Sequence, residues 1–343
     1  MGHPAATAAY SVPLTARFRG LERRDGLLLS GPAGWAEFSP FREYDDATCV
    51  PWARAALEAA ILPFPAALRA SVPVNVTVPA VGPERAHAIV AASGCTTAKV
   101  KVAEPGQSLA EEEVRLEAVR DALGPAGAIR VDANGGWSLE AALPAIRALD
   151  RAAGGLQYVE QPCATVEELA AVRRAVNVPI AADESIRRAS DPLRVAELAA
   201  ADVVVLKVQP LGGVRACLAL AEQVGLPVVV SSALESSVGI AAGVALAAAL
   251  PEEAATFRGV PLASGLATVQ LFGADVAARP LLPLDGTLPV RREAPDAPPA
   301  DGVGRGGWKA DAEVTDWWLR RARRVALLLP AAESAALLDL IVP

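Results

Sequence analysis

Short runs of β-branched residues alternate with longer segments rich in Ala, Leu, Glu and Arg from about residue 74 to residue 272. A short apolar run is typical of a buried strand, and a longer segment with helical periodicity is typical of a helix that covers it. The pattern therefore predicts repeated βα units and a parallel sheet. The predicted strands are Val74–Val78, Thr97–Val102, Ile129–Asp132, Leu156–Glu160, Ile180–Asp183, Val203–Lys207 and Val228–Ser231.

These strands are one short of a closed eight-stranded barrel. An eighth strand is expected at either Thr256–Arg258 or Leu266–Leu271, and the pattern does not choose between them. Successive strands with helices between them and no reversal of strand order favour a closed barrel of the TIM type over an open doubly wound sheet. The sequence thus predicts an α/β fold with a barrel domain over residues 74–290.

The segments on either side of the barrel have a different pattern. An α+β domain is expected over residues 1–73, and a linker and a helix, Val314–Val325, over residues 291–343. The helix is expected to pack back on the N-terminal domain, and no element is predicted for residues 327–343. The N-terminal elements are strands Ser11–Phe18, Leu27–Ser30 and Trp35–Phe38, turns at Arg24–Gly26 and Gly31–Pro32, and a helix over Asp45–Ala60.

Composition and charge narrow the function classes. Hydrophobic residues make up 52% of the 343 residues, which excludes disorder as the dominant state. The formal net charge of −7 argues against a general nucleic-acid or anionic-membrane binder. The four cysteines form no C-x-x-C pair and are predicted to be buried free thiols. The N-terminus lacks the pattern of a signal peptide, and the longest apolar stretch, Gly239–Leu250, is too short to cross a bilayer, so a cytoplasmic protein is expected. A monomer is favoured, since no oligomer is required.

Lysine is rare in this chain, with only Lys99, Lys101, Lys207 and Lys309 among 32 basic residues. Arginine keeps its proton in proteins, whereas the pKa of lysine shifts readily with its surroundings. A lysine therefore indicates a position where arginine would not serve. If acid/base chemistry occurs here, lysine is the leading candidate to perform it.

Ionisable residues stand at the C-terminal ends of five consecutive predicted strands, where the catalytic groups of such barrels are found. They are Lys101, Asp132, Glu160, Asp183 and Lys207, spaced 31, 28, 23 and 24 residues apart. Each step is about one βα unit. The spacing therefore predicts that the five groups meet at one rim of the barrel.

Unpaired charges in a barrel mouth would cost on the order of several kcal/mol, so these groups must pair with one another or with an ion. Asp132, Glu160 and Asp183 form the hard oxygen donor set that Mg²⁺ prefers, and Mn²⁺ is expected to substitute. Lys99 and Lys101 share a strand face, and with Lys207 they flank this predicted metal site. A dication lowers the pKa of a nearby amine and stabilises the enediolate of a carboxylate substrate. The sequence thus predicts proton abstraction by lysine from a small-molecule carboxylate.

These residues belong to a series of short motifs that resembles the muconate-lactonising branch of the enolase superfamily. The series is Lys-Val-Lys (99–101), Asp-Ala-Asn (132–134), Glu-Gln-Pro (160–162), Asp-Glu-Ser (183–185), Lys207 and Ser-Ser-Ala-Leu-Glu-Ser-Ser (231–237). Within that branch, residues 10–290, including the phrase at residues 30–41, look similar to the enzymes that dehydrate 2-succinyl-6-hydroxy-2,4-cyclohexadiene-1-carboxylate in menaquinone biosynthesis. The resemblance implies a modified (β/α)7β barrel with an N-terminal α+β capping domain.

The resemblance also implies a role for each site residue. Lys101 would be the base that removes the proton and then the acid that assists departure of the hydroxyl, Lys207 would stabilise the enediolate as a cation, and Lys99 would support Lys101. The loops Ala16–Leu21 and Phe38–Phe41 would cover the substrate. Asn134, Arg130, Ser231, Ser232 and Glu235 would line the rim as substrate-binding residues.

Three other functions remain open from the residues alone. Two lysines on opposite faces of an enediolate also suit an N-succinylamino acid racemase or a dipeptide epimerase. Lysines at barrel strand ends also serve Schiff-base aldolases, which would make Lys101 or Lys207 a nucleophile. A barrel without catalytic activity, kept as a binding scaffold, is the non-enzyme alternative.

Overall fold

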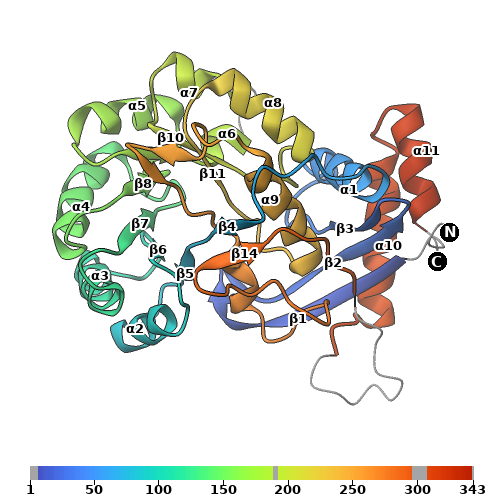
Figure 1. Cartoon of the computed structure of the whole chain (residues 1–343), viewed down its shortest axis with the longest axis horizontal. Coiled ribbons are helices and arrows are strands. Elements are labelled where there is room, and N and C mark those ends of the chain that lie inside the picture. The colour runs from blue at the N-terminus through green and yellow to red at the C-terminus, as the bar shows by residue number, and fades with distance from the viewer. Residues whose placement is uncertain (1–6, 188–191, 296–306, 342–343) are drawn as a thin grey trace.

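The computed structural model describes residues 7–187, 192–295 and 307–341. Over these residues the chain forms a parallel sheet wrapped by helices and, beside it, a three-stranded antiparallel sheet covered by helices from both ends of the chain (Figure 1). The mixed α/β fold expected from the sequence is confirmed.

The parallel sheet runs in chain order from β5 to β11, so each strand pairs with the strands before and after it in the chain. Each apolar run predicted from the sequence overlaps one of these strands, and only β7 extends beyond its predicted run, by one residue at its start. Their bounds are β5 Val76–Val78, β6 Thr97–Lys101, β7 Ala128–Asp132, β8 Tyr158–Glu160, β9 Ile180–Ala182, β10 Val203–Leu206 and β11 Val228–Val230.

Both expected positions of the eighth strand are wrong. Thr256–Phe257 (β12) forms a hairpin with Val260–Pro261 (β13), and Ala267–Leu271 (η1) is a 3₁₀ helix. The sheet is closed by the short segment between them, where Ser264 bridges Val74 and Gly265 bridges Ser231. Hydrogen bonds from Ser264 N to Pro73 O (2.7 Å) and from Gly265 N to Val230 O (2.8 Å) make this closure. The segment escaped prediction because it is brief and contains no β-branched residue.

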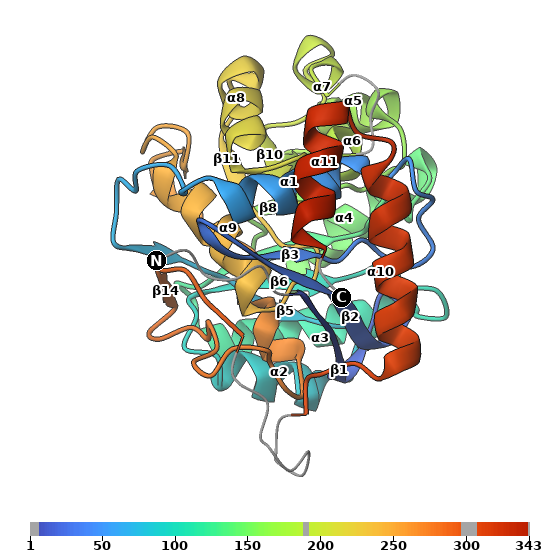
Figure 2. The ribbon, with the colours of Figure 1, turned by 90° about the vertical axis from the view of Figure 1, so that its right-hand side faces the viewer.

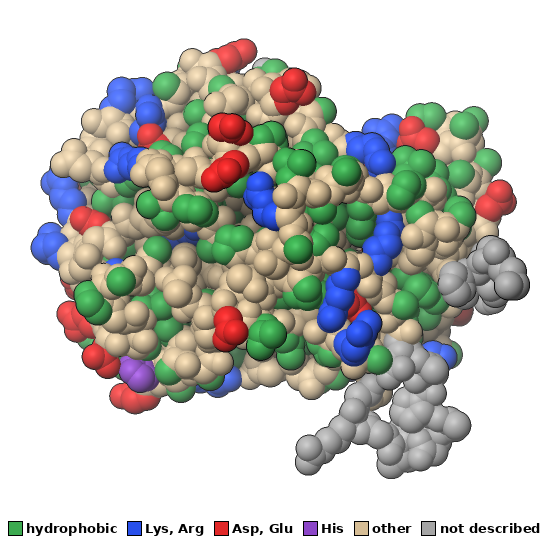
Figure 3. Space-filling model, viewed as in Figure 1, with side chains coloured by type: hydrophobic (Ala, Val, Ile, Leu, Met, Phe, Trp, Pro, Cys, Tyr) green, Lys and Arg blue, Asp and Glu red, His purple; other side chains and the backbone are tan. Residues whose placement is uncertain are grey.

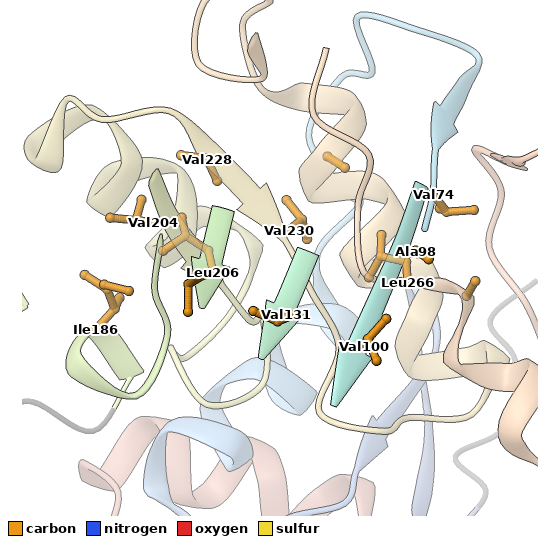
Figure 4. Packing of buried hydrophobic residues seen from close by; sticks show 14 of the residues in the cluster. Val74, Ala98, Val100, Val131, Ile186, Val204, Leu206, Val228, Val230 and Leu266 are labelled. Carbon is orange, nitrogen blue, oxygen red and sulfur yellow. The ribbon is translucent and has the colours of Figure 1, made fainter. Parts of the chain in front are cut away.

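Alternation along the strands separates two apolar layers. Val100, Val131 and Leu206 face outward into the main core between the sheet and its helices (Figure 4). Val203 and Val205 belong to a smaller cluster with Tyr158 inside the barrel. Because side chains alternate between faces, the charged residues at positions 99, 101, 130 and 132 point inward with that smaller cluster.

Helices follow the strands as the pattern predicted. Capping boxes fix the starts of two of them, with Ser108 and Glu111 at α3 and Thr165 and Glu168 at α5. These caps orient the connections at the barrel rim. The helices of the barrel are α2 Pro83–Ala91, α3 Leu109–Leu123, α4 Leu139–Ala152, α5 Val166–Ala175, α6 Glu184–Arg187, α7 Arg194–Glu197, α8 Val214–Val224 and α9 Ser237–Ala249.

The N-terminal sheet contains β1 (Thr7–Phe18), β2 (Leu21–Gly31) and β3 (Gly34–Phe38), followed by α1 (Val50–Ile61). The turn expected at Arg24–Gly26 is wrong. The chain reverses at Arg19 and Gly20, both with positive φ, and Arg24 lies inside β2. The Asp-Gly pair that suggested a turn is instead accommodated in the strand, where the missing side chain of Gly26 leaves room for Tyr10 and Ser39.

The C-terminal helices pack on this N-terminal sheet. Helix α10 (Ala312–Ala326) contains the predicted helix and contacts β1, β2 and α1, and α11 (Ala331–Leu340) lies beside it (Figure 2). A second short ladder joins β4 (Ser71–Pro73) to β14 (Thr287–Pro289). The division into domains at residues 73 and 290 stays a prediction, and part of the expected linker, residues 296–306, lies outside the described residues.

Other sequence expectations concern the surface and the thiols. All four cysteines are free and buried, as predicted. Acidic and basic side chains are interspersed over the face seen in Figure 3, without an extended patch of one sign. In the described part of the chain, no helix has the length and apolar character needed to span a membrane.

Trp318 of α10 is fully buried against the ring of Phe38 at a centroid distance of 5.9 Å. We expect Trp318→Ala to lower the free energy of unfolding by about 3–5 kcal/mol, because it leaves a large cavity between the helix and the sheet. Urea unfolding measures this change. Leu327→Ala, at a position 71% exposed, is the control and should change stability by less than about 0.5 kcal/mol. Equal effects of the two substitutions would contradict the packing described.

Candidate active site

Strand register brings the predicted site residues into one layer. Lys101 on β6 lies opposite Asp132 on β7, and Asp132 lies opposite Glu160 on β8. Asp183 and Lys207 directly follow β9 and β10. The carboxyl ends of the parallel strands therefore deliver these five side chains to the same end of the barrel, as their spacing predicted.

Each buried carboxylate is paired with a cation. Lys101 Nζ lies 2.6 Å from Asp132 Oδ2, and Lys99 Nζ lies 3.0 Å from that same oxygen. Lys99 Nζ also donates to Glu160 Oε1 at 2.9 Å. Lys207 Nζ donates to Asp183 Oδ2 at 2.5 Å. With side chains no more than 10% exposed, the charges are compensated inside the barrel mouth and not by solvent.

Burial and neighbouring charges shift the pKa values of these groups. Burial alone would raise the pKa of Asp132, but Lys101 and Lys99 hold it well below its usual range. Burial would likewise lower the pKa of Lys99, but Asp132 and Glu160 hold it well above its ordinary value. For Glu160, burial and the negative charge of Asp132 outweigh Lys99 and raise the pKa to about 7. The site thus contains carboxyl groups of very different acidity.

The donor chemistry of this cluster fits a divalent cation. Glu160 Oε2 is buried and, among the described residues, has no hydrogen-bond partner. Three carboxylates at adjacent strand ends, one with an unused oxygen, are the donors that Mg²⁺ takes. As they stand, no three acidic, His or Cys side chains of the described chain are arranged around a common metal position. The ammonium groups of the lysines hold the carboxylate oxygens instead.

A pocket of about 450 Å³, including its open mouth, lies above the charged cluster. Its lining includes Lys99, Lys101, Asp132 and Lys207, whereas Glu160 and Asp183 do not reach it. Phe18, Arg19 and Phe41 of the two predicted covering loops also line the pocket. The Phe18 ring centroid is 5.5 Å from Lys101 Nζ. Phe18 is the last residue of β1, so the segment expected to be a loop at Ala16–Leu21 is the end of β1, a turn at Arg19 and Gly20, and the start of β2.

The expected rim residues divide into two groups. Asn134, Ser231 and Ser232 line the pocket, and Asn134 Oδ1 accepts a hydrogen bond from Lys101. Arg130 is fully buried and donates to Gln157, Asn75 and the carbonyl oxygen of Ala263. Glu235 is also buried and accepts from Ala233 N. Neither Arg130 nor Glu235 is among the residues that line the pocket.

Arg187 is a pocket residue that the sequence pattern did not predict. It lies on the short helix α6, and its Nε is 2.9 Å from Asp183 Oδ1. Its spacing of four residues from Asp183 on a helix was the available signal. The guanidinium also pairs with Glu184, whose Oε1 accepts from Asn134 Nδ2 at 3.2 Å. Arg187 therefore links the loop after β9 to the loop after β7.

Comparisons with known proteins agree with this fold. Residues 83–304 match the family model "Enolase C-terminal domain-like", and residues 9–60 match "Enolase N-terminal domain-like". An o-succinylbenzoate synthase from Thermobifida fusca (strain YX) is 65% identical over 284 residues, which are 83% of this chain and 87% of that protein. An o-succinylbenzoate synthase from Mycolicibacterium smegmatis is 52% identical over 312 residues, covering 91% and 92%.

Solved structures show the same architecture. A substrate-liganded complex of the L-Ala-D/L-Glu epimerase from Bacillus subtilis superposes with a TM-score of 0.68 at 22% identity, over 84% of this chain and 96% of the epimerase. At this identity the likeness concerns the fold alone. The fold, the two matching family models and the cluster of carboxylates and lysines together identify this chain as a member of the enolase superfamily.

The two relatives at 65% and 52% identity then show which family of this superfamily the chain belongs to. The chain belongs to the o-succinylbenzoate synthase family of the enolase superfamily. The resemblance carried by the six motifs is confirmed.

Burial and the nearby Glu37 raise the pKa of Glu235 to about 7. A carboxyl group whose pKa is higher in the folded than in the unfolded chain loses stability as pH rises from the unfolded value, about 4.3, through the folded value. We therefore expect Glu235→Gln to be more stable than wild type at pH 8 by up to about 3 kcal/mol, with little difference at pH 4.

Urea unfolding of both proteins at the two pH values tests this expectation. Glu22→Gln, at an exposed position, is the control and should show no such pH dependence. An equal difference between wild type and Glu235→Gln at both pH values would refute the assignment of a raised pKa to Glu235.

Proposed function

We propose that this chain is a Mg²⁺-dependent carbon–oxygen lyase that dehydrates 2-succinyl-6-hydroxy-2,4-cyclohexadiene-1-carboxylate to o-succinylbenzoate, in menaquinone biosynthesis. The observation that carries the proposal is the meeting of Lys101 and Lys207 with three buried carboxylates beneath one pocket. The names of the relatives at 65% and 52% identity support the reaction. The proposed setting is a monomer in the cytoplasm.

Asp132, Glu160 and Asp183 would hold the Mg²⁺ ion, and Mn²⁺ would substitute. When bound, the ion supplies positive charge that makes a hydrogen next to a carboxylate more acidic. The ammonium groups would then be released from the carboxylates that they contact in this structure. Their Nζ atoms would become available to a substrate in the pocket, since Lys99, Lys101 and Lys207 already line it.

Lys101 would carry both proton transfers. Its neutral amine takes the proton from the ring carbon that bears the carboxylate, and an enediolate forms. The resulting ammonium then gives its proton to the departing hydroxyl, water leaves, and the ring becomes aromatic. The amine is thereby regenerated. Asn134, which accepts a hydrogen bond from Lys101, would aim its Nζ.

Lys207 would act as a fixed cation. It comes from β10, four strands away from β6 around the barrel, so its charge approaches the substrate from a different side than Lys101. Lys99, held by Asp132 and Glu160, would keep the charge of the cluster balanced around Lys101. Phe18 at the end of β1 and Phe41 in the segment after β3 would exclude water from the pocket.

Substrate conversion and metal removal test the proposed reaction together. We expect aromatic product from the cyclohexadiene substrate, loss of turnover after dialysis against EDTA, and recovery on adding Mg²⁺ or Mn²⁺. In D₂O, an N-succinylamino acid should exchange its α-hydrogen slowly or not at all compared with the dehydration.

Other outcomes identify the alternatives. Fast α-deuteration without aromatic product indicates a racemase or epimerase. Activity that resists EDTA, with trapping of a carbonyl substrate by borohydride, indicates a Schiff-base enzyme. Absence of turnover on every substrate offered, with metal binding intact, indicates a binding scaffold.

Lys101→Arg is expected to abolish turnover, by about 10³-fold or more, because the charge stays and the transferable proton does not. Far-UV circular dichroism and thermal unfolding should show an intact fold. Lys309→Arg is the matched control, since Lys309 is exposed and away from the pocket, and it should keep wild-type rates. Activity retained in Lys101→Arg would exclude Lys101 as the base.

A further inference from the structure

The N-terminal sheet buries one acidic and one basic side chain against a single loop of the barrel, residues 231–236. Glu37 on β3 is 3% exposed, and Arg24 on β2 is 2% exposed. Burying two charges is expensive unless each is fully hydrogen bonded. The partners of these charges therefore indicate what the two residues do.

Glu37 joins the N-terminal sheet to the start of α9. Its Oε2 accepts from Ser236 N and from Gly239 N, both at 3.1 Å, and from the Ser236 hydroxyl. Its Oε1 accepts from the hydroxyls of Tyr10 (2.7 Å) and Ser39 (2.6 Å). The carboxylate thus satisfies the free amides of the first helical turn from across the domain boundary.

Close approach at this point depends on a glycine. A Cβ atom on Gly239 would lie 2.9 Å from Glu37 Oε2 and 2.6 Å from the Cβ of Glu235. The absence of a side chain at position 239 lets the carboxylate reach the helix backbone. The contact is therefore built from both sides, by Glu37 on the N-terminal sheet and by Gly239 on α9.

Arg24 binds the same loop at the residues that precede Ser236. Its Nε donates to Leu234 O at 2.9 Å, and its Nη2 donates to Ser39 O and, at 3.4 Å, to Ala233 O. Leu234 has a φ of 65°, a backbone conformation that a leucine adopts only when its surroundings hold it there. Ala233 and Leu234 are lining residues of the pocket, so Arg24 holds part of the pocket wall.

The two residues also hold the opposite wall. The Arg24 guanidinium lies 4.6 Å from the ring centroid of Phe41, which lines the pocket from the N-terminal side. Ser39, bound by Glu37 and Arg24, donates its backbone N–H to Gln209 Oε1 at 3.1 Å. The same pair of charges thus contacts the covering loop at residues 39–41 and the barrel loop at residues 231–236.

We infer that Glu37 and Arg24 are positioning residues that set the distance between these two pocket walls, and thereby the affinity for substrate. Neither residue lines the pocket or touches the lysines, so the chemical step itself does not require them. Loss of either side chain makes loop 231–236 more mobile and lowers the affinity for substrate. The inference rests on the proposed function for its kinetic readout, but the order of the loop is measurable without any turnover.

Glu37→Ala and Glu37→Gln separate positioning from charge. In the alanine variant we expect KM to rise about tenfold or more while kcat changes less than about threefold, because hydrogen bonds to a charged group are lost from the loop. Hydrogen–deuterium exchange of residues 231–239 should accelerate by a similar or larger factor. In Glu37→Gln the amide oxygen still accepts from Ser236 N and Gly239 N, and its NH₂ donates to Tyr10 and Ser39, so both readouts should stay near wild type.

Leu337→Ala is the control for a general loss of stability. Leu337 is buried in α11, in the apolar cluster that also contains Phe38 and Phe41, and it does not line the pocket. This variant should lower Tm without raising KM or accelerating exchange in residues 231–239. If Glu37→Ala fails to fold, Arg24→Lys is the replacement variant. Lysine keeps the charge but lacks the separate guanidinium nitrogens that reach the carbonyl oxygens of Leu234 and Ser39, so the same rise in KM is expected.

Three results would overturn the inference. They are an unchanged KM and unchanged loop exchange in Glu37→Ala, a rise in KM in Leu337→Ala equal to that in Glu37→Ala, and a Glu37→Gln variant as impaired as Glu37→Ala. Failure of the proposed reaction is distinguished from these results. It would leave wild type without aromatic product, while hydrogen–deuterium exchange of residues 231–239 would still show whether Glu37 and Arg24 hold the loop.

Discussion

Compensation of buried charge is the constraint on which this active site depends. Asp132, Glu160 and Asp183 are almost completely removed from water, and each lies against a lysine or arginine that is itself nearly buried. None of these groups could stay ionised there alone, so the cluster is stable only as a set. The same mutual dependence holds the pKa of Asp132 and Asp183 below the usual range and keeps the lysines beside the pocket, whereas the pKa of Glu160 is raised to about 7.

Much of this arrangement could be predicted from the sequence because it follows from local rules. The strands could be recognised as β-branched runs. Because side chains alternate between the two faces of a strand, Lys99 and Lys101 were expected on the same face. The scarcity of lysine then marked three of the four lysines as residues of the site. Register between strands, which brings Lys101 opposite Asp132 and Asp132 opposite Glu160, follows from consecutive βα units of similar length.

Features that depend on contacts between distant segments could not be predicted in this way. The barrel closes through Ser264 and Gly265, whose strand character comes from their neighbours and not from their side chains. Arg130 shares the inward face with Asp132 but lies one layer deeper, where Asn75 and Gln157 bind it away from the pocket. The Asp25-Gly26 pair suggested a turn, yet Gly26 makes room for Tyr10 inside a sheet. In each case tertiary packing overrode a local signal.

The distribution of cations has a consequence for the alkaline behaviour of the whole molecule. Arginine supplies 28 of the 32 basic side chains and does not lose its proton in the range where proteins survive. Burial raises the pKa of Tyr158 to about 12 and that of Cys163 to about 11, which delays their ionisation as well. The positive charge supplied by arginine is thus constant in mild alkali, and Tyr158 and Cys163 stay neutral there. Asp132 and Glu160 hold the pKa of Lys99 well above its ordinary value, so the barrel mouth also keeps this positive charge in mild alkali.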